Sequence, residues 1–539
     1  MSGMCRRWSL QSMMWKKRCG PASWSSAIGL RAHRCSSNGF SIACVTPYTT
    51  SSMMSTPPCT LSSNALQTGK HRKLTAWLGC ILALTTVRAQ VPCEDGLAGQ
   101  YSCMGLDLMC VLSFEETGGN APGNGNDCWG WSSEGREFAL FGRSDGMSII
   151  EVTDPVNPVV VADVPTATVP SLWRDIKVID DMAYIVSEAG GHGLQIIDLS
   201  IVPDLVPGGA LANTAYYTGF GDAHNVVANP ETGFVYGVGT DTFSGGLHIV
   251  DVNDPLNPTA VGSWDESDIH DAQAVVYNGP DMDHAGREIV FAFCGYGGFR
   301  IIDVEDKEDC QTLSSLQDSC WVYVHQGWLS EDQRFVFMND EKDETTSVAE
   351  VTRTWVMDVQ DLDNPFIVGF HEGSLGVTDH NLYTLNNKVY AANYYAGLQV
   401  LDIVDPATAT LEMTAFFDTN PFSDQVGTSG GAWSVYPYFD SGNIAISTQS
   451  HFFMVRPSSE SHSVMEEEVP MLAIHARAGQ LSIRSGLVET ASVFDVSGRC
   501  MAEWPLAASG WSTFRMQGWP SGTYVVRTAS GRTARFIQP

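Results

Sequence analysis

Residues 246–258 read GLHIVDVNDPLNP, and this stretch is one copy of a pattern that recurs along the chain. Each copy has a glycine, an aliphatic run, an acidic residue and a turn, often Asp-Pro. The other copies are GMSIIEVTDPVNP from Gly146, GLQIIDLS from Gly193, GFRIIDVEDK from Gly298, TWVMDVQDLDNP from Thr354, GLQVLDIVDP from Gly397 and a degenerate HFFMVRP from His451. A period near 50 residues with several strands per repeat is typical of the blades of a β-propeller.

Each repeat reads as several short strands. Around the second copy, residues 174–179, 182–186 and 194–198 have strand patterns, and after other copies a fourth strand follows Asn-Pro, as in NPVVVADV and NPFIVGF. Proline cannot donate a hydrogen bond to a sheet, so it sits in the turn before that strand. Seven copies therefore predict an all-β chain with a seven-bladed β-propeller.

The last repeat lacks its fourth strand, because HFFMVRP runs directly into the polar stretch 458–470. An unassigned strand, LDLMCVL at residues 106–112, precedes the first repeat. We predict that this strand pairs with the last blade and closes the ring, which removes an open sheet edge.

The charge of the chain excludes some classes of function. Asp and Glu outnumber Lys and Arg by 61 to 30, and residues 1–89 contain no acidic residue, so the acidic excess belongs to the later part. Nucleic-acid binding needs a basic surface, and an acidic surface is also repelled by anionic membranes. Divalent cations suit such a surface, although a solvated acidic surface is the simpler interpretation.

The N-terminal region carries an export signal. The basic run Lys70-His71-Arg72-Lys73 precedes about eleven apolar residues and the small-residue pair of Val87-Arg88-Ala89, so residues 66–89 read as a secretory signal peptide. Residues 1–65 show no periodic pattern, and we expect an over-extended start without a fold. No other stretch qualifies as a transmembrane span.

Export permits disulfides. Eight cysteines follow Gln90, which is too few for a disulfide-built fold. Cys310 and Cys320 bracket a short loop and form the best local pair. Cys93, Cys103, Cys110 and Cys128 would form two more bridges, with the connectivity left open.

Six further motifs resemble the choice-of-anchor B family of LVIVD-repeat propellers. They occur in order between residues 100 and 457: WRDIKV (173–178), GFGDAHNV (219–226), HDAQ (270–273), HQGWL (325–329), DHNLY (379–383) and GAWSVYP (431–437). The resemblance implies a propeller over residues 90–457 that is attached to a cell surface. It implies no settled biochemical activity.

The C-terminal residues 471–539 resemble the sorting domain of the type IX secretion system of Bacteroidetes. The resemblance rests on VFDVSGRC (493–500) and GWPSGTYVVRTASGRTARFIQP (518–539), although the final Ile-Gln-Pro departs from the usual basic ending. Alternating residues and glycine-rich turns predict a small β-sandwich. The resemblance implies export by the type IX machinery, and an ordinary appended sandwich is the alternative.

Polar residues recur at or just before the first strand of successive repeats. They are Asp127 and Trp129, Trp173, Arg174 and Asp175, His224 and Asn225, His270 and Asp271, His325 and Gln326, Asp379, His380 and Asn381, and Trp433. From Arg174 to Trp433 they follow the blade period. First strands line the channel of a propeller, so we expect these groups to converge at one mouth of the channel.

Two interpretations of this convergence stay open. One is a ligand site made of Arg174, Asp175, His224, His270, Asp271, His325, Asp379 and His380, in which the four histidines bind a divalent metal such as zinc, manganese, iron or calcium. The other is that repeat symmetry places polar groups there to bind channel waters and neighbouring blades.

Other polar residues are given simpler roles. We expect His192, His248, His284 and His371, which lie off this spacing, to be surface or turn residues. Asp154, Asp254 and Asp405 precede proline and are expected to initiate turns. The acidic run 339–344 is expected to be a solvated loop, with cation binding as the lesser alternative.

The sequence supports two functions and does not decide whether the chain is an enzyme. The leading hypothesis is a secreted or cell-surface binding module for a protein, peptide or glycan. The rival is a metal-dependent hydrolase or oxidoreductase that uses the channel histidines.

Overall fold

The computed structural model describes residues 90–458 and, in the C-terminal part, residues 473–477, 480–484, 489–496, 498–507, 512–529 and 533–538. The expected extension at residues 1–65, the signal peptide at 66–89 and nearly all of the linker at 458–470 lie outside this range.

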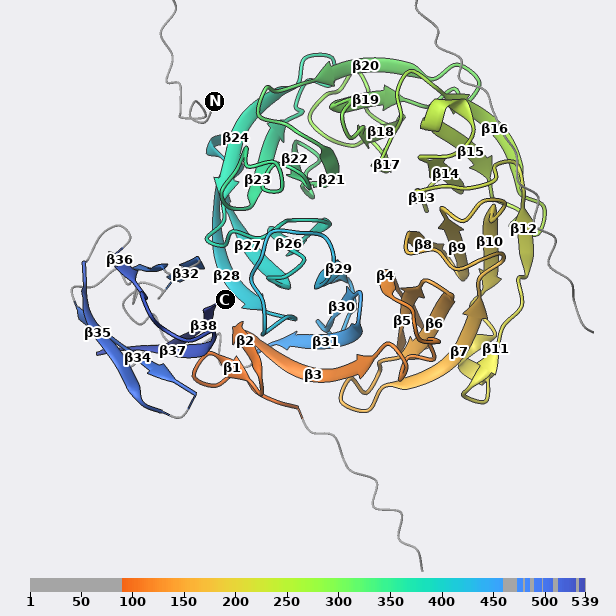
Figure 1. Cartoon of the computed structure of the whole chain (residues 1–539). Coiled ribbons are helices and arrows are strands. Elements are labelled where there is room, and N and C mark those ends of the chain that lie inside the picture. Colours follow the sequence, from red (N-terminus) through yellow and green to blue (C-terminus); the bar gives the residue numbers. More distant parts are fainter. Residues whose placement is uncertain are drawn as a thin grey trace, which may run out of the picture. The chain divides into compact units, whose positions relative to one another are not determined.

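Residues 97–457 form seven four-stranded antiparallel sheets arranged as the blades of a propeller (Figure 1). We number the blades in chain order, starting from the innermost strand of each. Blade 1 consists of β4 (Gly125–Ser133), β5 (Arg136–Arg143), β6 (Gly146–Glu151) and β7 (Val159–Pro165), and blade 2 consists of β8 (Arg174–Ile179), β9 (Met182–Ser187), β10 (Leu194–Asp198) and β12 (Ala215–Tyr217). Blade 3 consists of β13 (Asn225–Asn229), β14 (Phe234–Val238), β15 (Leu247–Asp251) and β16 (Thr259–Trp264). Blade 4 consists of β17 (Asp271–Val276), β18 (Glu288–Phe293), β19 (Phe299–Asp303) and β20 (Gln311–Leu316).

Blades 5 to 7 complete the ring. Blade 5 consists of β21 (Val324–Leu329), β22 (Phe335–Asp340), β23 (Arg353–Asp358) and β24 (Phe366–Glu372). Blade 6 consists of β25 (Leu382–Leu385), β26 (Lys388–Ala392), β27 (Leu398–Asp405) and β28 (Thr410–Phe417). Blade 7 consists of β29 (Ala432–Tyr436), β30 (Ile444–Thr448), β31 (His451–Pro457) and β3 (Leu106–Ser113). The innermost strands contact one another in the order β4, β8, β13, β17, β21, β25, β29 and again β4. The prediction of an all-β propeller is confirmed.

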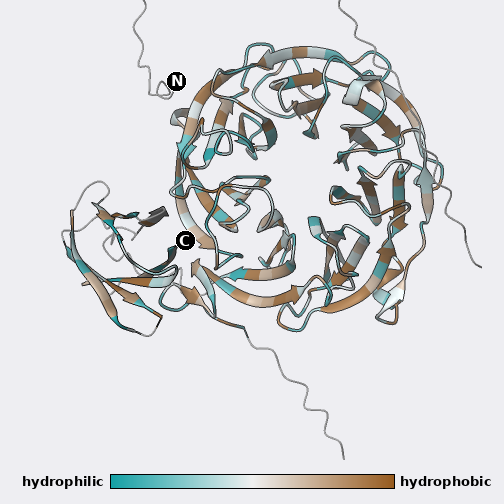
Figure 2. Ribbon diagram, in the orientation of Figure 1, coloured by the Kyte–Doolittle hydropathy of each residue, from teal (hydrophilic) through white to brown (hydrophobic). Residues whose placement is uncertain are grey.

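The repeated motif forms the third strand of each blade. Ile249 and Val250 in β15, like Ile301 and Ile302 in β19, are fully buried because each blade packs between two others. Such strands read as continuous apolar runs, and Figure 2 shows the hydrophobic colour along the blades. In four blades the acidic residue that ends the motif pairs with a basic residue at the start of the second strand or directly before it: Glu151 with Arg136, Asp303 with Arg287, Asp358 with Arg334 and Asp402 with Lys388.

The glycine that opens the motif lies against the end of the fourth strand. At Gly397, φ is +72° and an added Cβ would lie 2.1 Å from the carbonyl oxygen of Phe417. At Gly298, φ is +81° and the distance to the carbonyl oxygen of Leu316 would be 2.5 Å. Only glycine fits both the left-handed backbone and the close approach.

The expected turns also form. Asp154 Oδ2 accepts a hydrogen bond from Asn157 Nδ2 at 2.9 Å, and Asp254 Oδ2 accepts one from Asn257 Nδ2 at 2.9 Å. Asp405 Oδ1 accepts from the backbone N–H of Ala407 at 3.2 Å and begins the 3₁₀ helix η3 (Pro406–Thr408).

The ring closes as the strand count predicts. β3 pairs antiparallel with β31, with Leu106 opposite Pro457 and Leu112 opposite Phe452. Two further N-terminal strands, β1 (Leu97–Ala98) and β2 (Tyr101–Met104), extend blade 6 because β2 pairs with β28. The segment 97–113 therefore binds the two final blades at once.

Short elements outside the blades complete the propeller. β11 (Gly209–Ala210) pairs in parallel with β7, so an excursion from blade 2 returns to the rim of blade 1. The helical turns η1 (Val202–Asp204) and η2 (Phe243–Gly245) lie in connections. Neither these turns nor any other helix within the described residues is long and apolar enough to cross a membrane.

The predicted pairing of Cys310 with Cys320 is wrong. Cys310 is a free thiol and Cys320 is engaged in a disulfide of its own, whereas Cys93 and Cys103 form a bridge. The latter bridge ties the start of the described chain to β2. Sequence proximity alone does not bring Cys310, at the start of β20, against Cys320 beyond its end.

The C-terminal part contains two antiparallel sheets, as expected for a small sandwich. One has β32 (Ala473–Arg477), β33 (Gln480–Arg484) and β36 (Ser512–Arg515); the other has β34 (Glu489–Asp495), β35 (Cys500–Leu506), β37 (Gly522–Thr528) and β38 (Thr533–Gln538). Leu481, Val493 and Val526 are fully buried in one apolar core between them.

Closure by β3 should dominate the stability of the propeller. Deleting residues 90–113 exposes the edge of β31 and removes Leu106, Leu108 and Leu112, which are 1–7% exposed. Burial of three leucines alone stabilises the fold by about 5–9 kcal/mol. We expect the truncated protein to unfold at a much lower temperature or not to fold, as measured by circular dichroism and calorimetry.

A shorter deletion of residues 90–105 serves as the control, because it removes β1 and β2 but keeps β3. Its loss of stability should be clearly smaller. Equal melting temperatures for the intact chain and the 90–113 deletion would show that the ring does not depend on this strand.

Candidate functional site

A small cavity lies at one mouth of the channel, where the first strands of the blades begin. Its volume is about 10 Å³, about the space that one water molecule needs. The lining residues come from all seven blades and are Asp127, Trp173, Arg174, His224, Asn225, His270, His325, His380, Asn381 and Trp433. The repeat spacing places them together because each sits at the same position of its blade.

The four periodic histidines lie in one continuous row. The ring centroids of His224 and His270 are 4.2 Å apart, those of His270 and His325 are 4.2 Å apart, and those of His325 and His380 are 4.3 Å apart. Trp433 of blade 7 continues the row at 5.0 Å from His380. We call His224, His270, His325 and His380 the histidine row.

Burial keeps three members of the row neutral. It lowers the pKa of His380 to about 3, and burial together with the neighbouring imidazoles holds the pKa values of His270 and His325 well below their ordinary range. The Nδ1–H of His270 donates to the carbonyl oxygen of His325 at 3.0 Å, and that of His380 donates to the carbonyl oxygen of Trp433. This leaves the Nε2 lone pairs of both rings free to bind a metal ion or to accept a hydrogen bond.

The two ends of the row have different partners. His224 Nδ1 lies 2.6 Å from Glu188 Oε1 at the more exposed end. At the other end, the ring of Tyr394 lies 4.6 Å from that of His380, and its hydroxyl donates to Glu341 Oε1 at 2.9 Å.

Glu341 gives the row its best metal-binding geometry. One ligand atom each from His325, Glu341 and His380 lie within 4.8 Å of one another. Burial raises the pKa of Glu341, and its Oε2 is 4.0 Å from His325 Nε2. His325 Nδ1 is buried without a hydrogen-bond partner, so this imidazole is not committed to the fold through that atom. Two imidazoles and a carboxylate fit zinc, manganese or iron.

Two residues of the site, Glu341 and Tyr394, were not predicted from the sequence. Glu341 follows β22 and Tyr394 lies between β26 and β27, so neither belongs to the first strand of a blade. Glu341 sits inside the acidic run that we expected to be solvated, and no repeat pattern marks either residue.

Lys342 and two tyrosines form the rim beside the row. Lys342 Nζ lies 3.6 Å from the ring centroid of Tyr323 and 5.0 Å from that of Tyr296. The ring of Tyr323 is 5.2 Å from that of His270. Tyr296 is 74% exposed and Trp173 is 43% exposed, so this rim offers aromatic faces to solvent.

Below the histidine row lies a layer of buried charge. Asp175 Oδ1 is 2.6 Å from Lys177 Nζ. Burial, reinforced by Asp175, raises the pKa of Asp127 to about 8, and burial raises that of Asp271 to about 7 against the effect of Lys177. Asp175 and Asp271 therefore lie in the channel, but beneath the cavity and not in its wall.

Aromatic side chains fill the channel one step further in. The ring of Trp129 lies 5.8 Å from that of Tyr383 and 5.3 Å from that of Tyr436, and Trp328 lies 5.0 Å from Tyr383. Lys177 Nζ sits over Trp129 at 4.8 Å. The channel is therefore packed, and the open part of the site is its mouth.

Arg174 lines the cavity but holds two blades together. Its Nε donates to the carbonyl oxygen of Arg143 at 3.0 Å, its Nη2 donates to Thr166 Oγ1 at 2.6 Å, and its Nη1 donates to His192 Nε2 at 3.0 Å. Burial lowers its pKa to about 10. Most of its donors are already used by the fold.

Asp379 does not lie at the channel, contrary to the expectation. It immediately precedes His380, at the position that Ile269 and Val324 occupy before His270 and His325, and both of those residues are fully buried between blades. Asp379 is 1% exposed and accepts a hydrogen bond from the backbone N–H of Arg353. The register of the repeat sends its side chain into the blade interface.

The acidic run is also buried and not solvated. Asp340 and Asp343 are fully buried and Glu344 is 4% exposed. Asp340 accepts hydrogen bonds from the backbone N–H groups of Val322 and Tyr323, which fold the run against the start of blade 5.

Three of the four histidines that were expected to be surface or turn residues are buried. His192 supports Arg174, His248 Nε2 lies 2.7 Å from the hydroxyl of Tyr217, and His284 Nε2 lies 3.2 Å from Asp363 Oδ2. Asp281, His284 and Asp363 form a second group with metal-compatible spacing, away from the channel. His371 is half-buried and lines a pocket.

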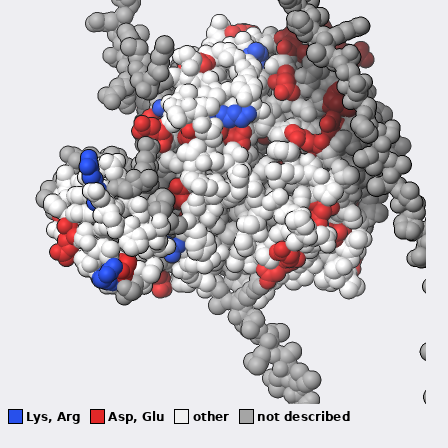
Figure 3. All heavy atoms as spheres, viewed as in Figure 1, with Lys and Arg blue, Asp and Glu red and all other residues white. Residues whose placement is uncertain are grey.

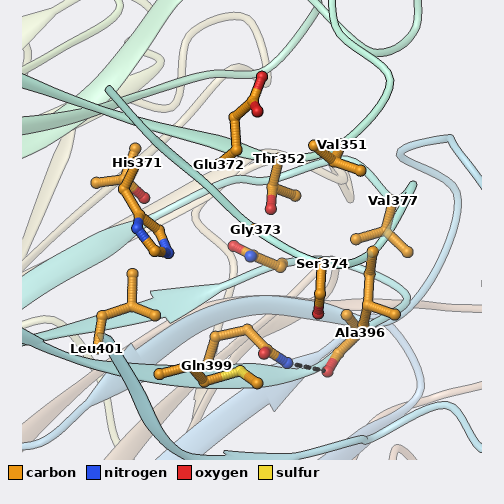
Figure 4. Close-up of a pocket in the computed structure, with 14 residues that line it drawn as sticks. Val351, Thr352, His371, Glu372, Gly373, Ser374, Val377, Ala396, Gln399 and Leu401 are labelled. Carbon is orange, nitrogen blue, oxygen red and sulfur yellow. Dashed lines mark hydrogen bonds between the residues drawn. The ribbon is translucent and has the colours of Figure 1, made fainter. Parts of the chain in front are cut away.

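That pocket lies between blades 5 and 6 and has a volume of about 410 Å³ (Figure 4). Figure 4 shows His371, Thr352, Ser374 and Gln399 around it, and Gln399 Nε2 donates to the carbonyl oxygen of Ala396 at 3.0 Å. Its volume suits a small molecule. No sequence motif pointed to it.

No family model and no curated protein sequence matches the chain. Among solved structures, the chain is similar to the WD40 β-propeller domain of Doa1, with a TM-score of 0.44 and 10% identity, over 66% of this chain and 98% of that one. The blade architecture rests on the strand pairing of this chain itself.

Proposed function

We propose that this protein is a cell-surface or secreted recognition module of the choice-of-anchor B type, and that it binds its partner at the channel mouth. The observation that carries the proposal is the packed channel. The histidine row, the buried charges and the aromatic layer leave a cavity of only about 10 Å³ at the mouth, which cannot enclose a molecule larger than water. A partner that binds at the mouth would therefore contact its outer surface.

The rim of the mouth has the chemistry for such binding. Trp173 and Tyr296 offer exposed aromatic faces, and Lys342 and Glu188 supply opposite charges nearby. Aromatic side chains supply large contact area at low entropic cost, and they stack on sugar rings and peptide groups alike. Carboxylates are prominent on the face of the propeller in Figure 3, which favours a neutral or basic partner.

We propose that the protein is located at the cell exterior. The signal-peptide pattern at residues 66–89 and the resemblance of residues 471–539 to a type IX sorting domain support it. The C-terminal sheets have an apolar core of their own, as an independent sorting module requires.

The second candidate is a metal-dependent hydrolase or oxidoreductase. It is favoured by one observation, the spacing of His325, Glu341 and His380. These residues would hold the ion, which would act as a Lewis acid or lower the pKa of a bound water. Tyr394 would orient Glu341 through its hydrogen bond.

Removal of the rim aromatics should abolish recognition. We expect the double variant Trp173→Ala, Tyr296→Ala to lose at least tenfold in affinity for any glycan or peptide that the intact protein binds on arrays, because exposed aromatic anchors dominate such contacts. Met282→Ala is the control, since Met282 is 77% exposed in the loop at the opposite end of β17. Equal losses in both variants would exclude the mouth as the binding face.

The metal group predicts a specific stoichiometry. After incubation with zinc and dialysis, the intact protein should retain about one equivalent of zinc, as measured by inductively coupled plasma mass spectrometry. His325→Gln and His380→Gln should weaken retention at least tenfold, whereas His224→Gln, which removes the far end of the row, should not. Retention below a tenth of an equivalent by the intact protein would exclude a zinc enzyme at this group.

The sorting hypothesis predicts a change of location. Without residues 471–539, the propeller should fold but stay in the periplasm, because the type IX machinery would no longer recognise it. Cell fractionation with surface proteolysis measures this. Unchanged surface display of the truncated chain would contradict the hypothesis.

A further inference from the structure

The pocket of about 410 Å³ between blades 5 and 6 lies where one repeat departs from the pattern of the others. In the other six blades, the residue four positions before the acidic residue that ends the motif, or before Arg456 in blade 7, is apolar and at most 1% exposed: Met147, Leu194, Leu247, Phe299, Leu398 and Phe452. Blade 5 has Thr354 at this position, and Thr354 lines the pocket. The smaller side chain leaves unfilled a volume that the other blades fill.

The residue opposite Thr354 on the fourth strand departs from the pattern as well. The other six blades pair two apolar or aromatic side chains here: Met147 with Val164, Leu194 with Tyr217, Leu247 with Trp264, Phe299 with Leu316, Leu398 with Phe417 and Phe452 with Leu112. In blade 5, Thr354 of β23 pairs with His371 of β24. Directly opposite residues of an antiparallel pair share one face of the sheet, so blade 5 lines the pocket with a polar pair.

Blade 6 supplies the opposite wall, which contains an unsatisfied acceptor. Asn393 lies in the connection between β26 and β27, lines the pocket and is 6% exposed. Its Oδ1 is buried without a hydrogen-bond partner. Buried amide oxygens normally accept a hydrogen bond, because an unpaired one costs stability. This atom therefore indicates a donor that the described chain does not supply.

The interior of the pocket carries no charge. None of the described residues that line it is Lys or Arg. Its one carboxylate, Glu372, points away from the other labelled residues in Figure 4 and lies 3.5 Å from Arg353 Nη2. Burial lowers the pKa of His371, so this imidazole is neutral at pH 7. An ionic ligand would lose its hydration here without gaining a charged partner, so the pocket favours uncharged molecules.

Aliphatic side chains form much of the remaining wall. Leu375, Val377 and Leu401 contribute apolar surface, and the lining residues include no Phe, Tyr or Trp on which a sugar ring would stack. Val377 and Ala396 are 0% and 2% exposed and pack in one cluster with Tyr394, which fixes this wall in the absence of a ligand. A pre-formed and mostly apolar pocket with a few polar groups is the usual form of a small-molecule site.

We propose that this pocket binds a small uncharged molecule in which a secondary amide is attached to an apolar group. The amide N–H donates to Asn393 Oδ1, and the amide carbonyl accepts from the hydroxyl of Thr354 or from the imidazole of His371. The apolar group contacts the aliphatic wall. The proposal does not rest on recognition at the channel mouth, because neither the histidine row nor the rim aromatics line this pocket.

Two sources supply such an amide, and two probes separate them. N-acetyl-leucine amide represents an acylated amino acid or peptide end, and N-acetylglucosamine represents an N-acetylated sugar. The aliphatic wall and the lack of an aromatic ring for stacking favour the first. N-acetyl-leucine, which has a carboxylate in place of the terminal amide, tests the requirement for an uncharged ligand.

The test is titration of the full-length protein with each probe, measured by saturation-transfer difference NMR and isothermal titration calorimetry. We expect saturable binding of N-acetyl-leucine amide with a Kd of about 10⁻³ M, the affinity that ordinary ligand efficiency gives to a molecule of this size. N-acetyl-leucine should bind roughly tenfold more weakly or not at all, because its charge finds no partner in the pocket. Equal affinity for the charged and the uncharged probe would contradict the proposal.

Three variants place the binding in this pocket. Thr354→Leu restores the kind of side chain that the other blades carry; it should weaken binding roughly tenfold or more and leave Tm equal or higher, because it fills a cavity. Asn393→Ala removes the unpaired acceptor and should weaken binding about three- to tenfold, the effect of one hydrogen bond. Thr259→Leu makes the first change at an exposed position of blade 3 and should bind as the unaltered protein does.

The outcomes separate this pocket from the channel mouth. The double variant Trp173→Ala, Tyr296→Ala should bind the probes unchanged, so a failure of recognition at the mouth would leave this result intact. Binding of N-acetylglucosamine alone would support the proposal and assign the amide to a sugar. No binding of either uncharged probe up to about 10⁻² M, roughly ten times the expected Kd, or equal binding by Thr354→Leu would overturn it. If Thr354→Leu does not fold, Asn393→Ala decides in its place.

Discussion

The antiparallel pairing of β3 with β31 joins the two ends of a chain of blades, and every other feature of the propeller depends on it. Each blade packs only on its two neighbours, so the ring has one junction that is not made by consecutive repeats. β2 strengthens that junction by pairing with β28, and the bridge between Cys93 and Cys103 ties the preceding segment to it. The position of His380 relative to Asp127 across the channel is fixed only when the junction is closed.

The histidine row follows from this closure. Repeat symmetry brings one side chain per blade to the same height, and the radius of seven blades sets ring-centroid spacings of 4.2–4.3 Å. Imidazoles so close cannot all carry charge, and burial selects the neutral form of His270, His325 and His380. Neutral imidazoles such as His270 and His380, with free Nε2 atoms, are suited to metal ions and hydrogen-bond donors, and unsuited to anions, which need charged partners.

The sequence predicted what the repeat controls. The period gave the blades, the count of strands gave the role of residues 106–112, and the spacing of His224, His270, His325 and His380 placed them at one mouth; whether they bind a ligand or a metal stays a prediction. Features that vary between repeats were not predicted from the sequence. Asp379 carries a charge where other blades have Ile269 or Val324, and only the register of neighbouring repeats reveals that the position is buried.

Loops account for the rest of what was missed. Glu341 reaches the histidines from a connection whose length and course differ from those of other blades, so no period marks it. The acidic run looked solvated because carboxylates usually are, and its burial depends on tertiary contacts with Val322 and Tyr323. The disulfide between Cys310 and Cys320 was wrongly predicted for the same reason, since a short separation in sequence does not show how far apart β20 places these two residues.

Ring closure by β3 also determines when during synthesis the propeller can be completed. Asp107 and Ser458, which meet across the junction through a hydrogen bond, are 351 residues apart in the chain. At a synthesis rate of about 5–20 residues per second, the segment 97–113 waits roughly 20–70 s for its partner strands to be made. During that interval its apolar side chains have nothing to pack against, so this segment is the part of the nascent chain most in need of protection from aggregation.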